Sequence, residues 1–129
     1  PAFRAGLGQD EGTGSLVTRP YCPERGDVVW LAFSPQAAHE QGGRRPALTL
    51  SPDSYNRKVG LALCCPITSR EKGYPFEVAV PPGLDISGVV LSDQLRSLDW
   101  SARDSRLCCR VPELTVAEVL GKLGSLLKS

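Results

Sequence analysis

The side chains in this sequence that are best suited to chemistry are basic, and they gather in the middle of the chain. Between positions 44 and 72 basic residues outnumber acidic ones, with Arg44, Arg45, Arg57, Lys58, Arg70 and Lys72 against Asp53 and Glu71. A local surplus of this kind can follow a phosphate backbone. Scattered surface charge is the alternative interpretation, and the net charge of +1 for the whole chain does not by itself favour a nucleic-acid partner.

The residues that usually bind metal ions do not form a recognisable motif. His39 is the single histidine, and no C-x-x-C spacing occurs among the cysteines Cys22, Cys64, Cys65, Cys108 and Cys109. The sequence therefore predicts no metal site and no cofactor. Adjacent cysteines on a strand point to opposite faces, so we expect each pair to place one reduced thiol inward and one outward. A redox role is the less favoured alternative.

Length and composition indicate one globular domain. The chain has 129 residues, of which 41% are hydrophobic, and typical domains hold roughly 100–150 residues. No run reaches the ~18 apolar residues of a membrane span, and no secretory leader is recognisable, so we expect a cytoplasmic protein without a membrane partner. The glycine-rich residues 1–20 are expected to be a flexible arm or a remnant of cloning, and residues 21–129 the folded domain.

From Gly26 onward the sequence shows short β-rich runs separated by turn signals. Strands are predicted over 26–33, 45–51, 61–68, 76–80 and 88–91, with a further one around 93–98. Pro66 is expected to close the third of these strands. Residues 34–44 indicate a loop, and residues 52–56 a turn or a short helix.

The C-terminal segment changes from strand to helix periodicity. Thr115 and Glu118 have the spacing of a capping box, and an apolar stripe follows at helical intervals, formed by Val116, Val119, Leu120, Leu123, Leu126 and Leu127. We expect an amphipathic helix that packs on the sheet or, alternatively, on a partner. Short strands, turns and a final helix together predict a mainly β fold with helices, built as a small and strongly bent β-barrel.

Several of these segments together resemble one protein family. The stretch GRRPALTLSPDSYNRKVGLALCCPITSREKGYPFEV (43–78), with GDVVWLAF before it and GVVLSDQLRSLDW after it, is similar to the MazF/PemK family of toxin endoribonucleases. The resemblance implies an SH3-like barrel, a homodimer, and metal-independent cleavage of single-stranded RNA to 2′,3′-cyclic phosphate and 5′-hydroxyl ends. It also implies a MazE-like antitoxin, whose acidic and largely disordered tail would cover the basic groove.

The resemblance assigns the chemistry to three residues. Arg45, in the motif Arg-Pro-Ala, takes the place of the family's central catalytic arginine, and its guanidinium can fork onto two phosphate oxygens. Because an arginine ordinarily stays charged, charge stabilisation is favoured over an acid–base role. Thr68, in the motif Pro-Ile-Thr, would donate a hydrogen bond to the scissile phosphate. Glu40 would act as a base or hold Arg45, and a loop charge without chemistry is the alternative.

Further residues are expected to contact the RNA. The resemblance places Gln41 in a loop that covers the substrate and Lys72 in a Lys-Gly-Tyr-Pro-Phe turn. The complete expected set is Gln41, Arg44, Asn56, Ser69, Arg70 and Lys72. Arg44 is expected to point to the face opposite Arg45, and an asparagine in a turn, such as Asn56, is also commonplace without any ligand.

Two alternative functions stay open at this point. CcdB-type toxins share the same barrel and poison DNA gyrase without cutting RNA, although the motifs around Arg45 and Thr68 speak against that class. A non-catalytic RNA-binding module is the other alternative. His39 is expected to be an exposed bystander, and residues 93–97 (DQLRS) would help to build the dimer and the floor of the groove.

Overall fold

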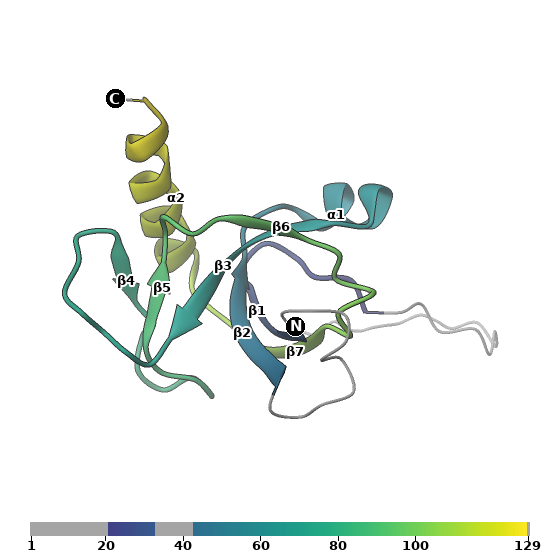
Figure 1. Ribbon diagram of the computed structural model, residues 1–129, viewed down its shortest axis with the longest axis horizontal. Coiled ribbons are helices and arrows are strands. Elements are labelled where there is room, and N and C mark those ends of the chain that lie inside the picture. The colour runs from purple at the N-terminus through teal and green to yellow at the C-terminus, as the bar shows by residue number, and fades with distance from the viewer. Residues whose placement is uncertain (1–20, 33–42, 129) are drawn as a thin grey trace.

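Within residues 21–32 and 43–128, which the computed structural model describes, the chain forms seven short strands and two helices (Figure 1). In chain order these are β1 (Asp27–Ala32), β2 (Arg44–Thr49), α1 (Asp53–Val59), β3 (Ala62–Thr68), β4 (Glu77–Ala79), β5 (Val89–Leu91), β6 (Arg96–Leu98), β7 (Arg106–Arg110) and α2 (Glu113–Lys128). The predicted mainly β fold with a C-terminal helix is therefore confirmed, and β7 is an additional strand that the turn pattern did not indicate.

The strands form one bent antiparallel sheet in the order β4-β5-β3-β2-β1-β7, and β6 lies off this path beside β3. Strand β3 has three neighbours. Its first part pairs with β2 and β6, and its last two residues, Ile67 and Thr68, pair with β5. Pro66 lies inside β3 rather than closing it, and its missing N–H falls where the strand passes from β2 to β5. Among the described strands the sheet is open between β4 and β7.

Both faces of the sheet carry an apolar cluster, because successive residues of a strand point to opposite sides. Leu48 and Cys65 belong to one cluster, whereas Ala47 and Cys64 belong to the other. Strand β3 is therefore covered on both faces, and both of its cysteines are buried. The expectation of one inward and one outward thiol is wrong for this pair. Burial raises the pKa of Cys64 to about 11 and that of Cys65 to about 12, so both remain protonated at neutral pH.

The second cysteine pair departs from alternation for a different reason. Cys109 lies opposite Val28 and Leu107 opposite Val29, so Cys108 is an extra residue in the ladder between β1 and β7. Such a bulge interrupts the regular alternation of side chains, and both cysteines are half-buried against the same apolar cluster. The inward–outward expectation is wrong here too. All five cysteines are free thiols.

The segment 52–56, predicted as a turn or a short helix, contains the start of helix α1. The helix ends at Gly60, whose φ of 84° is left-handed and whose N–H donates to the Asn56 carbonyl oxygen at 2.9 Å. Glycine adopts this conformation without the steric cost that a Cβ would add. The chain thereby turns sharply after α1 and enters β3.

Helix α2 begins at Glu113, two residues before the predicted capping box, so that box is wrong. Thr115 lies buried in the first turn, where its N–H donates to the carbonyl oxygen of Pro112 at 3.0 Å. Val116 and Val119 pack into the core, whereas the C-terminal half of the helix stands away from the sheet (Figure 1). Part of the predicted apolar stripe is consequently exposed, and Leu127 is 76% exposed. None of the described helices combines the length and apolarity that a membrane span requires.

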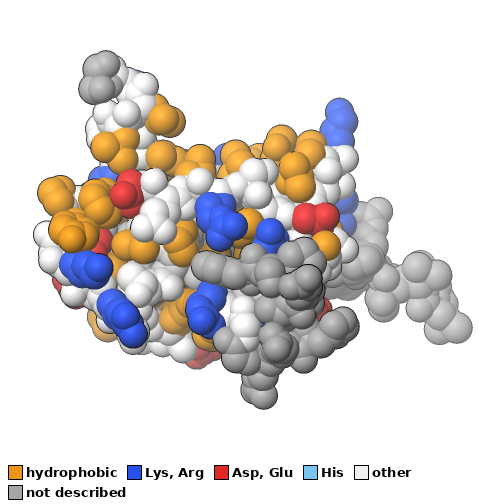
Figure 2. Space-filling model, viewed as in Figure 1, with side chains coloured by type: hydrophobic (Ala, Val, Ile, Leu, Met, Phe, Trp, Pro, Cys, Tyr) orange, Lys and Arg blue, Asp and Glu red, His pale blue; other side chains and the backbone are white. Residues whose placement is uncertain are grey.

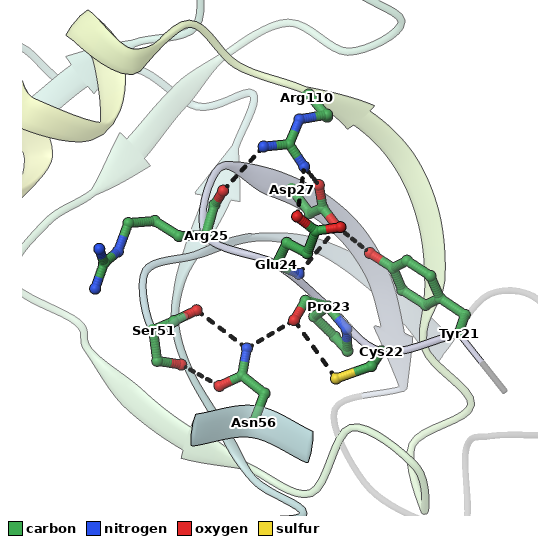
Figure 3. Close-up of polar contacts among 9 residues, drawn as sticks. All are labelled: Tyr21, Cys22, Pro23, Glu24, Arg25, Asp27, Ser51, Asn56 and Arg110. Carbon is green, nitrogen blue, oxygen red and sulfur yellow. Dashed lines mark hydrogen bonds and ion pairs between the residues drawn. The ribbon is translucent and has the colours of Figure 1, made fainter. Parts of the chain in front are cut away.

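A buried carboxylate anchors the start of β1 (Figure 3). Asp27 is fully buried and accepts hydrogen bonds from the Tyr21 hydroxyl at 2.5 Å and the Glu24 N–H at 3.0 Å. The Arg110 guanidinium from the end of β7 forms an ion pair with the same carboxylate. A buried charge is tolerated when it is paired and hydrogen-bonded in this way. The start of β1 and the end of β7 are thus joined by an ion pair.

Candidate nucleic-acid interface

Arg45 and Thr68 lie at the same end of two neighbouring strands. The pairing of β2 with β3 ends at Ala47 and Pro66, and Arg45 and Thr68 each lie two residues further on, on the same face as that pair. Beyond it the strands separate, because β2 continues along β1 while β3 continues along β5 (Figure 1). The two predicted catalytic side chains therefore stand on either side of the point where the strands part. Arg45 is exposed and Thr68 half-buried.

The Thr68 hydroxyl is oriented by the chain that follows it. Its oxygen accepts a hydrogen bond from the Arg70 N–H at 3.1 Å. A threonine hydroxyl has one proton to donate besides its accepting lone pairs, and this contact uses only a lone pair. The hydroxyl can therefore donate to an anionic oxygen placed beside it.

Gly88 supports Thr68 from behind and was not identified from the sequence. Its φ is 129°, and a Cβ at this position would lie 2.3 Å from the Thr68 carbonyl oxygen. Glycine is required for both reasons, the backbone conformation and the close approach. A glycine as the first residue of a predicted strand was the only signal in the sequence, and it does not distinguish a close contact from an ordinary turn.

A pocket with a volume of about 180 Å³ lies beside Thr68. Its lining comes from β3, the segment between β3 and β4, the start of β4, β5 and the residues after β5, and comprises Thr68, Arg70, Lys72, Tyr74, Phe76, Glu77, Leu91 and Gln94. We call residues 69–76 (SREKGYPF) the basic loop. Arg70 and Lys72 of this loop are exposed, and the rings of Tyr74 and Phe76 have centroids 5.3 Å apart. Cations interleaved with aromatic rings are suited to single-stranded nucleic acid.

The two neighbouring arginines of β2 have different surroundings. Arg44 forms an ion pair with Asp104, and Arg106 approaches the same carboxylate at 3.3 Å. Arg45 is more exposed, as expected for the opposite face of the strand. Figure 2 shows that Lys and Arg side chains are dispersed over this side of the molecule rather than gathered in one block. The expected RNA contact of Arg44 stays a prediction, and its charge is already matched by Asp104.

The expectation that Asn56 presents its amide to RNA is wrong. The side chain is fully buried, and its Nδ2 donates to the Pro23 carbonyl oxygen at 2.8 Å and to the Ser51 carbonyl oxygen at 3.0 Å (Figure 3). Its Oδ1 accepts from the Ser51 hydroxyl at 2.5 Å. The position in a helix turn suggested exposure, but α1 turns this residue into the core. We call Tyr21, Pro23, Glu24, Asp27, Ser51, Asn56 and Arg110 the Asp27–Asn56 cluster.

The remaining expected site residues divide between described and undescribed parts of the chain. Ser69 is exposed in the basic loop, next to Thr68. Glu40, Gln41 and His39 lie outside the described residues, so their roles stay predictions. Within the described ranges no group of three or more His, Cys, Asp or Glu side chains is arranged to hold a metal ion. The segment 93–97 leads into β6 on the edge of β3, with Leu95 exposed.

Known proteins with this arrangement are toxins. Residues 24–127 match the sequence profile of the family described as PemK-like, MazF-like toxin of type II toxin–antitoxin system. The endoribonuclease toxin MazF of Escherichia coli K12 is 49% identical over 88 residues, which cover 68% of this chain and 78% of that protein.

Solved structures agree in fold. A crystal structure of MazF from Deinococcus radiodurans has a TM-score of 0.76 and 58% sequence identity, covering 85% of this chain and 100% of that one. A MazE–MazF crystal structure from the same organism has a TM-score of 0.76 and 54% identity, covering 84% of this chain and 97% of that one. The class defined by the fold and its relatives is the endoribonuclease toxin, as the sequence predicted. The chain belongs to the PemK-like, MazF-like toxin family.

Proposed function

We propose that this toxin cuts single-stranded RNA at a phosphate bound between the side chains of Arg45 and Thr68. The reaction needs no metal ion and leaves 2′,3′-cyclic phosphate and 5′-hydroxyl ends. The observation that carries the proposal is the register of β2 and β3, which sets both side chains two residues beyond the last pair and on one face. A phosphate placed where the strands part would meet a guanidinium from one side and a hydroxyl from the other.

In this mechanism the RNA 2′-hydroxyl attacks the neighbouring phosphorus, and negative charge grows on the phosphate oxygens. The bond from phosphorus to the 5′-oxygen of the next nucleotide breaks, and that oxygen takes a proton from water and leaves as the 5′-hydroxyl. Arg45 neutralises that charge by donating two parallel N–H···O hydrogen bonds to the phosphate oxygens. The Thr68 hydroxyl donates a hydrogen bond to the same group, because its oxygen is oriented by the Arg70 N–H. Glu40 is the proposed base for the 2′-hydroxyl. Arg70, Lys72 and Ser69, with Gln41, are proposed to hold the backbone on either side.

Cleavage by the purified full chain tests this proposal. A long RNA is incubated with the protein in excess EDTA, and the new ends are mapped. We expect cutting to persist at defined sequences, with 5′-hydroxyl ends that a polynucleotide kinase labels without prior phosphatase treatment. Loss of cutting in EDTA, with recovery on added magnesium or zinc, would contradict the metal-free mechanism.

We also propose that the toxin is a homodimer. An apolar groove of about 430 Å³ lies between α1 and α2, and it is lined by Arg25, Leu50, Ser51, Pro52, Tyr55, Leu63, Leu95, Leu120 and Leu123. Figure 2 shows hydrophobic side chains along this upper edge of the molecule. The groove includes Leu95 of the segment that the family resemblance assigns to the dimer, and a second copy of the chain is its proposed occupant. Light scattering coupled to size exclusion should give twice the chain mass at micromolar protein, and a monomer that still cuts RNA would exclude this role.

The proposed inhibitor is a MazE-like antitoxin, because the similar Deinococcus radiodurans toxin has been solved with MazE. We propose that its acidic, disordered tail folds over the basic loop, where it would compete with RNA, and that both proteins act in the cytoplasm. Titrating a synthetic acidic tail peptide of the cognate antitoxin into the toxin should displace a fluorescent RNA. Simultaneous binding of peptide and RNA would contradict competition.

A further inference from the structure

The basic loop is held in shape by one carboxylate that comes from outside it. Glu77, the first residue of β4, is half-buried and accepts the Gly73 N–H on Oε1 at 2.9 Å. The Lys72 N–H lies 3.1 Å from Oε2 and 3.3 Å from Oε1. Hydrogen bonds of this kind, from backbone N–H groups to an ionised carboxylate, are stronger than those between neutral groups. Gly73 has a left-handed φ of 82°, which completes the turn around the carboxylate.

Helix α2 holds the same loop at its other end. The Lys122 ammonium group donates to the Pro75 carbonyl oxygen and, at 3.4 Å, to the Glu77 carbonyl oxygen. The Glu77 N–H in turn donates to the Tyr74 carbonyl oxygen at 3.1 Å. Backbone groups on both sides of the loop's apex are therefore satisfied by side chains outside it, and the exposed side chains of the loop are left to face solvent.

We propose that Glu77 is a positioning residue for RNA, which acts by fixing the backbone of Lys72 and Gly73 and does not touch the substrate. This inference rests on the proposed function, because it gives the basic loop the task of binding RNA. Glu77 contributes to the pocket beside Thr68, where a carboxylate facing the substrate would repel a phosphate. Its oxygens instead point into the loop backbone, so its negative charge serves to order Arg70, Lys72 and Tyr74.

The positioning role and simple charge repulsion predict effects of opposite sign. If Glu77 orders the loop, Glu77→Ala raises KM for a defined RNA on the order of tenfold, the size expected from lost charge-assisted hydrogen bonds, while kcat changes little. If Glu77 only repels RNA, the same variant lowers KM. Glu71→Ala is the matched control, because Glu71 is exposed in the same loop and makes no hydrogen bond within the described part of the chain. We expect Glu71→Ala to lower KM slightly or leave it unchanged.

Two further variants grade the effect. Glu77→Gln keeps one accepting oxygen for a backbone N–H but presents an NH₂ group to the other, so its KM should lie between those of the wild type and Glu77→Ala. Lys122→Met keeps most of the side-chain length and removes the donor to Pro75, and it should raise KM less than Glu77→Ala does. A Glu77→Gln protein indistinguishable from wild type would overturn the role of the second hydrogen bond.

Amide hydrogen exchange without RNA separates this inference from the proposed function. We expect the Lys72 and Gly73 amides to be protected in the wild type and to exchange at least several-fold faster in Glu77→Ala, with the thermal midpoint of the two proteins compared as a fold control. Unchanged exchange at these amides overturns the inference, as does faster exchange with unchanged KM. A wild type that cuts no RNA refutes the proposed function, and the exchange rates then still decide whether Glu77 orders the loop.

Discussion

The Asp27–Asn56 cluster and the basic loop are both polar, but the polar side chains of the first are mainly buried and those of the second are mainly exposed. In the cluster the side chains turn inward, and Asp27 and Asn56 are fully buried and form hydrogen bonds with the chain itself. In the basic loop the backbone is held by Glu77 and Lys122, and the side chains of Arg70, Lys72 and Tyr74 are exposed. Polar residues therefore stabilise the fold in one place and face solvent in the other.

This difference teaches which polar residues to assign to function. Removing a buried group whose hydrogen bonds are satisfied destabilises the protein, because its former partners are left without a hydrogen bond to water or to protein. Removing an exposed side chain from a fixed backbone changes the stability of the protein little, and the effect appears in the affinity for any ligand that binds there. Stability and activity measured on the same variants should therefore separate the two regions.

The largest expected effect is on stability, from Asp27→Asn. The substitution keeps the volume but removes the charge that pairs with Arg110 and accepts from Tyr21. Asp27 accepts charge-assisted hydrogen bonds from Tyr21, Glu24 and Arg110, and each such bond contributes about 1.5–3 kcal/mol, so the free energy of unfolding in urea should fall by about 3–5 kcal/mol. Asp53→Asn, at an exposed position on α1, should cost less than about 1 kcal/mol. Equal decreases in the free energy of unfolding of the two variants would show that the buried Asp27 carboxylate contributes no more to stability than an exposed one.

Next in size is the loss of catalysis from Arg45→Ala. Removing a preorganised donor to the transition state should lower the cleavage rate by about 10²–10³, with an unchanged thermal midpoint because the side chain is exposed. Arg57→Ala on α1 and His39→Ala serve as controls and should keep nearly full activity. An inactive His39 variant beside an active Arg45 variant would move the catalytic centre from Arg45 to His39.

Asn56→Ala should destabilise the protein without changing its affinity for RNA. The buried carbonyl oxygens of Pro23 and Ser51 would lose their donor, which costs about 1–3 kcal/mol for each group left unsatisfied. The dissociation constant is measured below the unfolding transition, with Ser54→Ala, exposed on the same helix, as the control. A large loss of RNA affinity in a folded Asn56 variant would return this residue to the interface.

The smallest expected effect comes from Lys72→Ala. Its exposed ammonium group is proposed to neutralise one phosphate, so affinity should fall a few-fold. The slope of log K against log salt should become shallower by about 0.7 for a single strand. Lys58→Ala, exposed on α1, should leave the slope unchanged. An unchanged slope for Lys72→Ala would remove this residue from the phosphate contacts.

The fold was largely predictable from the sequence because its strands carry strong local signals. The runs around Val28 and Leu48 became β1 and β2, and the apolar stripe around Val119 became α2. The capping box failed because Thr115 and Glu118 fit that pattern equally well inside a first turn. The cysteine pairs failed because alternation predicts which side a residue faces, but not whether that side is covered or whether a bulge intervenes.

The candidate site was predictable only where a motif marked it. Arg45 and Thr68 came from family motifs, and the structure adds the register that brings them to one end of the sheet. Glu77 was read as an ordinary strand residue, since its role depends on the backbone direction of Lys72 and Gly73. Asn56 was assigned to RNA because a turn asparagine looks the same in sequence whether it faces solvent or the core.

Gly88 is a position where substitution should impair the candidate site although the residue itself is not expected to contact RNA. A Cβ at this position would lie 2.3 Å from the Thr68 carbonyl oxygen, so any replacement must displace the strand end that carries the hydroxyl. In a selection for cells that survive overproduction of the toxin, substitutions at position 88 should be recovered alongside those at Arg45. Such survivors would contain the toxin at an undiminished level, detectable by immunoblot, and would mark a residue through which the scaffold limits how this toxin can evolve.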